Sequence, residues 1–357
     1  MRHWFSATRS RPSEAGTWLK SALTAGTSLS GALLLSTQVA TAAQSTQGES
    51  TAERDESHYI SCTRLDTLPD DDAGAWFAHS LIAQRCYGFQ AVALRLGMGS
   101  LRTFLFEHRI QNGVEQQRVQ YLDGPAETVE HENRSHGLWW TDHAAGPGPA
   151  SIDDTVSQLE TLYDFDLAAR DIVAGRKALV IDITPRDSLR FPRRLWVDLA
   201  SGLPLRQQLL DQKGQVMDIV QVVRLDSLVR TGEEIRVVTD EAAPLERQGW
   251  RPDWLPEGFY RQPLKTGTAS EGDDVRRQLY SDGLATLSIF VVPTDGQRTT
   301  LREGVHQLGN FRAAARFIEF KGRDYQVIAV GLMPAETLAR VVASVSQTST
   351  DEDGSLP

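Results

Sequence analysis

Apolar and polar residues alternate along much of the chain from about residue 89 to residue 226, and this pattern predicts β-strands. Phe104, Phe106 and Ile110 fall on one face of a strand from Leu101 to Ile110, because successive side chains of a strand point to opposite faces. Asn112-Gly113 follows as a hairpin turn. Later strands are predicted at 179–183, 195–198, 205–210 and 216–225. Turn residues between the last three strands indicate an antiparallel meander.

Two sections interrupt this alternation. Asp70-Asp71-Asp72 offers an N-cap and first-turn acids to a helix that ends at about Gly88. Its apolar side carries Trp76, Phe77, Leu81 and Ile82. Residues 139–167 form a second helical or irregular section, and Asp142 to Ala150 within it are predicted to be a mobile loop. The expected fold class is α+β, with an open antiparallel half-barrel wrapped around helices.

A second, smaller α+β domain is predicted after a weakly patterned stretch. Strands are expected at 276–280, 286–292, 317–320 and 326–330, followed by a closing helix after Pro334, since proline is favoured at the first helical position. The predicted boundaries are a first domain at 58–228, a linker at 229–250, a second domain at 251–346 and a polar tail at 347–357.

The N-terminus has the pattern of a secretory signal. Arg2, Arg9, Arg11 and Lys20 precede a weakly apolar stretch, and Ala40-Thr41-Ala42 resembles a signal-peptidase site. The alternative is an uncleaved membrane anchor, which requires ~20 predominantly apolar residues. Polar residues and glycines interrupt the stretch here, so we predict a signal peptide at 1–43 and a flexible leader at 44–57.

Composition excludes some partners. With 40% hydrophobic and 24% charged residues, the chain resembles a soluble globular protein. Residues 1–43 carry four basic residues and one acidic residue, so their removal changes the formal net charge from −10 to −13. Such an acidic protein has no general attraction to nucleic acid, and we expect no nucleic-acid partner. Any lipid binding requires an apolar surface or a local basic patch.

The two cysteines, Cys62 and Cys86, lie near the predicted mature N-terminus. In an oxidising compartment such a pair can close a short loop as a disulfide, but spacing alone does not decide whether the bond forms. The pattern lacks Cys-x-x-Cys or nearby paired histidines, which disfavours a redox or metal site.

Several segments resemble the MucB/RseB regulators of the bacterial envelope stress response. In the first domain these are Tyr163-Asp164-Phe165, Leu195-Trp196-Val197-Asp198, Gly202 to Arg206, and Leu210-Asp211 followed by Gly214. In the second domain they are Pro252 to Phe259, Leu279 to Leu284, Gly331 to Pro334, and Thr337-Leu338-Ala339. The resemblance covers about Leu81 to Val345 and is weakest from Cys86 to His143.

This resemblance implies a fold, a partner and a location. The first domain is expected to be similar to the lipoprotein carriers LolA and LolB, which hold acyl chains in an open barrel. Family members act in the periplasm, bind the periplasmic region of a transmembrane anti-sigma factor and shield it from the site-one protease. Lipid or lipopolysaccharide fragments release that shield. The implied output is negative regulation of an extracytoplasmic sigma factor, and a homo-oligomer is a further candidate assembly.

Candidate binding residues are apolar in one group and basic in another. The lipid-cavity candidates are Val92, Leu94, Phe104, Phe106, Ile110, Trp139 and Trp140. An apolar concave face beside a movable loop can hold a ligand, although filled core is the favoured interpretation for any single one of these residues. The candidates for contact with an anionic group or partner are Arg190, Arg193, Arg194, Arg276 and Arg277. Arginine suits phosphates and carboxylates, while a solvated turn is the alternative interpretation of the first three.

The sequence contains no His-Glu-x-x-His pair, no Gly-x-Ser-x-Gly elbow and no phosphate-binding glycine loop. We therefore expect no enzyme activity, no metal site and no cofactor. Two hypotheses remain: a periplasmic regulator that caps an anti-sigma factor and senses lipid, or a periplasmic carrier or chaperone for lipids or lipoproteins. The predicted second domain favours the regulator, because a carrier needs only the half-barrel.

Overall fold

The computed structural model describes residues 58–97, 100–124, 128–132, 151–232, 234–237, 249–262, 275–294, 301–309 and 311–348. The predicted signal peptide, the leader, Trp139, Trp140 and the loop at 142–150 lie outside the described residues. Among the described helices, none is long and apolar enough to cross a membrane.

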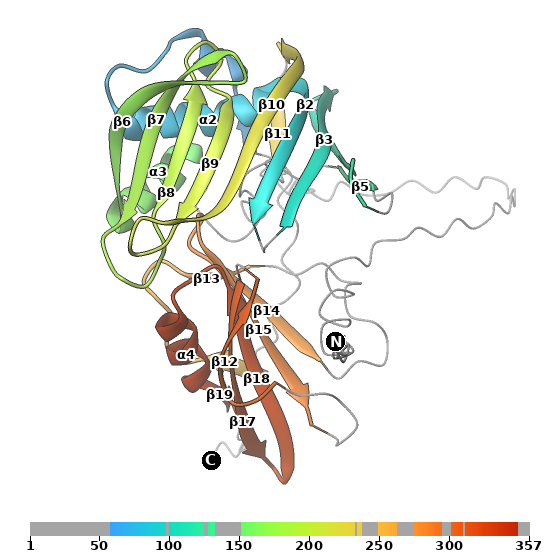
Figure 1. Cartoon of the computed structure of the whole chain (residues 1–357), viewed down its shortest axis with the longest axis vertical. Coiled ribbons are helices and arrows are strands. Elements are labelled where there is room, and N and C mark those ends of the chain that lie inside the picture. The colour runs from blue at the N-terminus through green and yellow to red at the C-terminus, as the bar shows by residue number, and fades with distance from the viewer. Residues whose placement is uncertain are drawn as a thin grey trace, which may run out of the picture. The chain divides into compact units, whose positions relative to one another are not determined.

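The first domain is a curved antiparallel sheet (Figure 1). Within the described residues it has nine strands in the order β5-β4-β3-β2-β10-β9-β8-β7-β6. Their bounds are β2 Tyr87–Gly97, β3 Ser100–Gln111, β4 Val114–Tyr121, β5 Thr128–Glu132, β6 Tyr163–Val173, β7 Arg176–Pro185, β8 Arg193–Asp198, β9 Pro204–Leu210 and β10 Val216–Arg230. Asn112 and Gly113 both have positive φ in the β3–β4 turn, as the predicted hairpin requires.

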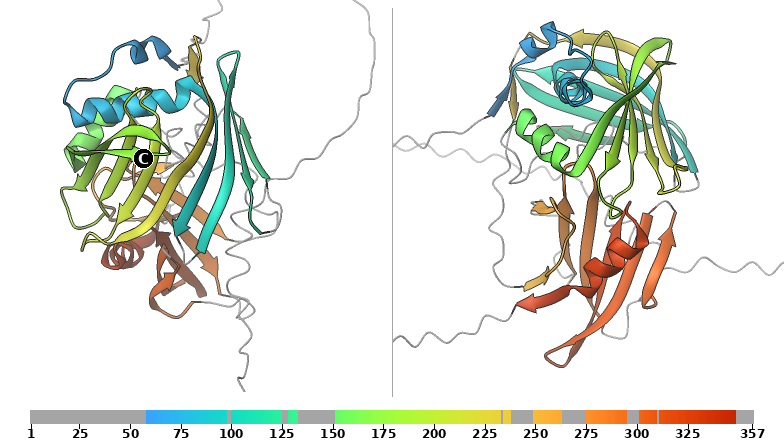
Figure 2. Two further views of the ribbon diagram at one scale, coloured as in Figure 1. Left: turned by 45° about the horizontal axis from the view of Figure 1, so that its top comes forward. Right: turned by 90° about the vertical axis from the view of Figure 1, so that its left-hand side faces the viewer.

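Two helices lie within the curve of this sheet, α2 (Ala73–Cys86) and α3 (Ile152–Leu162) (Figure 2). The side chain of Asp72 caps α2 by accepting a hydrogen bond from the backbone N–H of Ala75 at 2.5 Å, which agrees with the predicted acidic cap. Both helices pack on β6, β7 and β8 through one core cluster. This cluster contains Phe77, Leu159, Ile181 and Leu195. The sheet is therefore an open half-barrel around helices, as expected.

Short elements pack at one edge of the first domain. A 3-10 helix, η1 (Cys62–Asp66), precedes α2, and strand β1 (His58–Ile60) pairs with β11 (Ile235–Val237). Strand β10 continues to Arg230. Residues 229–230 and 235–237, predicted as linker, thus belong to β10 and β11, because their backbone hydrogen bonds are completed by β2 and β1.

The second domain is an antiparallel sheet covered on one face by a helix. In the described residues its order is β13-β14-β15-β18-β17-β16. The bounds are β13 Tyr260–Gln262, β14 Arg276–Ser281, β15 Thr286–Pro293, β16 Gly304–Leu308, β17 Phe311–Phe320 and β18 Arg323–Gly331, with α4 Ala335–Ala343. Strand β12 (Gly249–Pro252) pairs with β19 (Val345–Thr348). The predicted tail therefore begins inside a strand, because residues 347 and 348 pair with Trp250 and Gly249.

Candidate functional site

The inner face of the half-barrel is apolar over β2, β3 and β10. Phe104 lies opposite Ala93 and Phe106 lies opposite Ala91, and all four pack in one buried cluster with Phe89. The same cluster includes Leu203, Val220 and Val222. The exposed fractions are 8% for Phe104 and 2% for Phe106. The predicted apolar face therefore exists, and its side chains are packed against one another.

Val92 and Leu94 do not belong to that face. They lie opposite Leu105 and Thr103, one residue out of phase with the phenylalanines, so their side chains point to the outer side of the sheet. The structure corrects this part of the predicted cavity: the small residues Ala91 and Ala93 take the inner positions. Ile110 is on the inner side but packs with the cluster around Cys62 and Cys86.

The outer face carries an apolar band instead. Leu96 and Leu101 lie opposite each other at the β2–β3 hairpin and are 49% and 58% exposed. Leu122 and Val216, at 51% and 47%, are also exposed. We refer to Leu96 and Leu101 as the outer apolar band. Exposed clusters of this kind mark surfaces that contact proteins or membranes.

Cys62 and Cys86 are joined in a disulfide with a Cα–Cα distance of 5.5 Å. The bond ties η1 to the last residue of α2. Both cysteines are buried beside Ile82 and Ile235. The disulfide therefore lies in a buried apolar environment, where it holds α2 close to η1 and β11.

A buried cluster of charged residues lies next to this disulfide. His108 Nε2 is 3.2 Å from Glu115 Oε1, and the Glu115 carboxylate also accepts from Arg85 Nη1 at 3.5 Å. His108 Nδ1 is 2.7 Å from the carbonyl oxygen of Tyr87. Burial raises the pKa of Glu115, but Arg85 and His108 lower it more, so the net pKa lies below its ordinary value.

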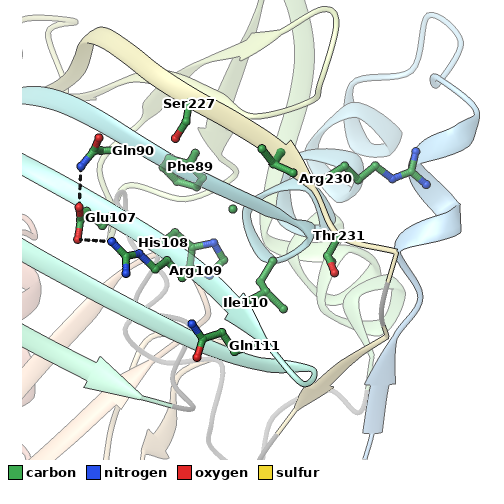
Figure 3. Close-up of a pocket in the computed structure, with 12 residues that line it drawn as sticks. Phe89, Gln90, Glu107, His108, Arg109, Ile110, Gln111, Ser227, Arg230 and Thr231 are labelled. Carbon is green, nitrogen blue, oxygen red and sulfur yellow. Dashed lines mark hydrogen bonds and ion pairs between the residues drawn. The ribbon is translucent and has the colours of Figure 1, made fainter.

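A hollow of about 440 Å³ lies over β2, β3 and β10 (Figure 3), and Gly88 is among its lining residues. Figure 3 shows Gln90, Glu107 and Arg109 connected in a row across the two strands. Arg230, also at the hollow, pairs with Asp66 and donates to the carbonyl oxygen of Cys62. Because both arginines already have acidic neighbours, the hollow is not an evident receptor for an anion.

Two arginines of the predicted basic cluster around Phe191-Pro192, Arg190 and Arg193, lie inside the protein. Arg190 is 1% exposed and Arg193 is 8% exposed. Arg193 Nη2 donates to the carbonyl oxygen of Leu284 at 2.6 Å. The structure thus corrects the prediction for Arg190 and Arg193. Their guanidinium groups are not free for an external anion, because groups from the second domain accept their hydrogen bonds.

Asp282, in the β14–β15 turn, is the main partner of Arg190. Arg190 Nε and Tyr163 Oη donate to Asp282 Oδ2 at 2.6 and 2.8 Å. The other oxygen, Oδ1, accepts from the backbone N–H groups of Leu284 and Ala285. Arg190 also donates to Asp187 and to the carbonyl oxygen of Glu257. We refer to Arg190, Asp282 and Tyr163 as the junction triad.

Burial and the neighbouring Asp282 charge raise the pKa of Tyr163 well above its ordinary value. The phenol therefore stays protonated and donates its hydrogen bond. The sequence patterns did not single out Tyr163 or Asp282 as site residues, although both lie in segments quoted for the family resemblance. Their pairing joins residues 119 positions apart, which no local pattern reveals.

The other candidate arginines are differently placed. Arg194 makes two hydrogen bonds to Asp182 at 2.5 and 2.7 Å on the sheet surface. Arg276 is exposed on β14. Arg277 lies over the ring of Phe290 at 5.7 Å and reaches Ser288 Oγ at 3.5 Å, and burial lowers its pKa. The structure does not gather these three with Arg190, and their contact with a partner stays a prediction.

Among the described residues, no group of three or more His, Cys, Asp or Glu side chains is arranged to hold a metal ion. What the described geometry offers is binding surface: an apolar inner face, the outer apolar band, and a buried junction between two domains.

Comparisons with known proteins match both domains. The family model of the MucB/RseB N-terminal domain matches residues 72–246, and that of the MucB/RseB C-terminal domain matches residues 244–346. The sigma factor AlgU regulatory protein MucB of Pseudomonas aeruginosa is 32% identical over 289 residues, covering 77% of this chain and 90% of that protein. The sigma-E factor regulatory protein RseB of Escherichia coli K12 is 24% identical, covering 76% and 90%.

A solved structure agrees with the sequence comparison. The crystal structure of MucB in complex with MucA(peri) superimposes with a TM-score of 0.60 at 30% identity, covering 78% of this chain and all of that chain. The similarity thus extends over both domains in the same order. From its two matched domains and its 32% identity to one of these regulators over 77% of its length, the chain belongs to the MucB/RseB family.

Proposed function

We propose that this protein is a periplasmic negative regulator of an extracytoplasmic sigma factor, which binds the exported part of a membrane-spanning anti-sigma factor and shields it from proteolysis. The observation that carries the proposal is the two-domain similarity to a MucB that was crystallised with MucA(peri). Two of the relatives are sigma factor regulatory proteins by name. The exported location rests on the signal-like N-terminus, and the disulfide fits an oxidising compartment.

The outer apolar band supports a protein-binding role. Leu96 and Leu101, which are 49% and 58% exposed, lie opposite each other on the outer side of the sheet, and their burial against a partner is favourable by about 25 cal/mol per Å² of apolar area. A carrier that acts only through its inner face has no need of such a band. This favours the regulator over a lipid or lipoprotein carrier.

Lipid sensing is the second part of the proposal. An acyl chain entering the half-barrel contacts the inner cluster of Phe104, Phe106 and Phe89. Because these side chains are packed, entry requires them to separate, and a ligand that does so favours a different conformation from the ligand-free one. If the anti-sigma segment prefers the closed conformation, the two ligands oppose each other by linkage.

A binding titration tests both parts. The mature protein is titrated with the exported segment of the candidate anti-sigma factor, with and without lipopolysaccharide fragments. We expect binding that the fragments weaken. Absence of binding contradicts the regulatory role, and binding that is indifferent to the fragments contradicts lipid sensing alone.

Two neighbouring residues of β3 give a matched pair of variants. Phe104→Ser places a polar group on the inner face, whereas Leu105→Ser changes the outer face, since the two side chains point to opposite sides. We expect Phe104→Ser to reduce the effect of lipopolysaccharide fragments on partner binding at least severalfold and Leu105→Ser to leave it unchanged. Equal effects of both substitutions contradict a lipid site on the inner face.

A further inference from the structure

The junction between the two domains contains a buried ion pair whose carboxylate oxygens both accept hydrogen bonds. The side chains of Arg190 and Asp282 are both 0% exposed. Arg190 comes from the β7–β8 connection of the first domain, and Asp282 comes from the β14–β15 turn of the second. Each oxygen of the Asp282 carboxylate accepts hydrogen bonds, two on Oδ2 and two on Oδ1. An ion pair of this kind stays favourable only while its geometry is kept, because an isolated buried charge is costly.

Further contacts surround the junction triad. Arg193 donates to the carbonyl oxygen of Leu284, and Thr337 Oγ1 donates to the carbonyl oxygen of Leu189 at 3.1 Å. The guanidinium carbons of Arg190 and Arg312 lie 5.3 and 5.1 Å from the rings of Phe259 and Phe191. These contacts join the domains from both sides, so rotation of one domain against the other breaks several of them at once.

The junction is also continuous with the core around α3. Leu284 belongs to the same buried cluster as Leu159, Leu162 and Tyr163. An added Cβ at Gly258 would lie 2.4 Å from Leu162 Cδ1, and one at Gly283 would lie 3.6 Å from Leu159 Cδ2. The second domain thus rests directly on the C-terminal end of α3. The turn that carries Asp282 is therefore in van der Waals contact with that helix.

We propose that the junction triad is a latch that makes the two domains one cooperative unit and transmits a movement of α3 in the half-barrel to the second domain. Domain rearrangement in this protein then does not come from free motion about a linker. It requires the Arg190–Asp282 pair to open, which makes the latch a two-state element.

Ligand-free protein tests the latch without any assumption about partners. Calorimetric unfolding of the wild type is compared with Asp282→Asn, which keeps the shape of the side chain but removes its charge. The matched control is Asp182→Asn, which removes the acid from the half-exposed Arg194–Asp182 pair. We expect a single transition for the wild type and the control. For Asp282→Asn we expect two transitions, the first several degrees lower.

Hydrogen exchange provides an independent measurement if Asp282→Asn folds poorly. Tyr163→Phe removes one hydrogen bond of the triad and leaves the ion pair in place. Faster exchange in segments 159–163, 187–193, 252–259 and 281–285 of Tyr163→Phe, with no change in Asp182→Asn, supports the latch. Two separate transitions in the wild type overturn it, as does exchange in Tyr163→Phe that matches the wild type.

The transmission step rests on the proposed lipid sensing, and its test is kept separate. Lipopolysaccharide fragments added to the wild type should accelerate exchange at 252–259 and 281–285 as well as in α3. A change confined to α3 overturns transmission and leaves lipid sensing intact. No change anywhere contradicts lipid sensing in the proposed function, whereas the ligand-free measurements still decide the latch.

Discussion

Individual residues show how burial changes the meaning of a charge in this protein. Arg190 and Arg194 are four positions apart, yet Arg190 is enclosed with Asp282 and Arg194 lies 39% exposed beside Asp182. An exposed pair contributes about 0–1 kcal/mol, while removing one partner of a buried pair costs about 3–5 kcal/mol. The same residue type in one short segment therefore has two different roles.

Glu115 gives a pH-dependent prediction at this scale. Its pKa in the folded protein lies below the ordinary value of 4.5, because Arg85 and His108 outweigh the effect of burial. A carboxyl group whose pKa is lowered by folding stabilises the folded state at pH values above its pKa in the unfolded chain. This stabilisation is lost as the pH falls through the pKa of the folded protein. Glu115→Gln should therefore lower the free energy of unfolding at neutral pH by about 3 kcal/mol.

Urea unfolding at neutral pH and below pH 4.5 checks the prediction for Glu115→Gln. The difference between variant and wild type should shrink on acidification. Glu107→Gln, on the outer side of β3, is the control and should show a smaller effect at neutral pH. A stability difference for Glu115→Gln that is the same at both pH values contradicts the assigned sign.

Gly202 and Gly214 form a second comparison at this scale. Both have positive φ, +76° and +78°, and an alanine in that region costs about 1–2 kcal/mol. At Gly202 an added Cβ would also lie 2.3 Å from His79 Cδ2, whereas nothing lies within 4 Å at Gly214. We expect Gly202→Ala to be more destabilising than Gly214→Ala by about 1–3 kcal/mol in urea unfolding. Equal losses would show that His79 moves aside freely.

At the scale of elements, the register of β2 against β3 decides which side chains share a face. The alternation in β3 alone places Phe104 and Phe106 together, and the structure agrees. The phase of β2 was mispredicted, because apolar residues occur on both faces of this strand: Ala91 and Ala93 inside, Val92 and Leu94 outside. A shift of one residue in register exchanges the two faces, so a strand with two apolar faces does not reveal its own phase.

The disulfide that joins η1 to α2 gives a prediction about stability. Cys62 and Cys86 are separated by 24 residues in the sequence. A disulfide that closes a loop of this size lowers the conformational entropy of the unfolded chain and so stabilises the fold by about 3 kcal/mol. The double substitution Cys62→Ser with Cys86→Ser should lower the free energy of unfolding by about that amount. Adding a reductant should destabilise the wild type similarly and leave the variant unchanged. A wild type that is insensitive to full reduction contradicts a stabilising role.

At the scale of the whole molecule, the acidic net charge and the pairing of arginines with acidic residues predict that lipid binds through apolar contacts. The chain has a formal net charge of −10. The arginines at the end of the inner face are paired, Arg95 with Asp218 and Arg102 with Asp123. No local excess of positive charge is evident at this described rim to attract a phosphate.

Binding of detergent micelles to the mature protein checks this prediction. We expect the same apparent affinity for micelles with zwitterionic and with anionic headgroups, and little dependence on salt, because screening affects only charged contacts. Binding that is confined to anionic micelles and lost at high salt contradicts it. Such a result would indicate that one of the two ion pairs opens for a headgroup.

The amino-acid sequence by itself determined the fold class, the strand meander, the capped first helix and the two-domain order. These features depend on local periodicity, turn chemistry and family motifs, all of which are written in neighbouring residues. It also placed Phe104 and Phe106 on one apolar face.

Only the tertiary structure decided which groups Arg190 and Arg193 contact and that residues 235–237 form a strand. Arg190 and Arg193 were candidates for contact with an anionic group or a partner, with a solvated turn as the alternative, but their acceptors, Asp282 and Leu284, lie 92 and 91 residues away in this chain. Residues 235–237 likewise pair with a strand that is distant in the sequence, β1. Contacts between distant segments arise when the chain closes around its core, and no short-range pattern records which charge will meet which.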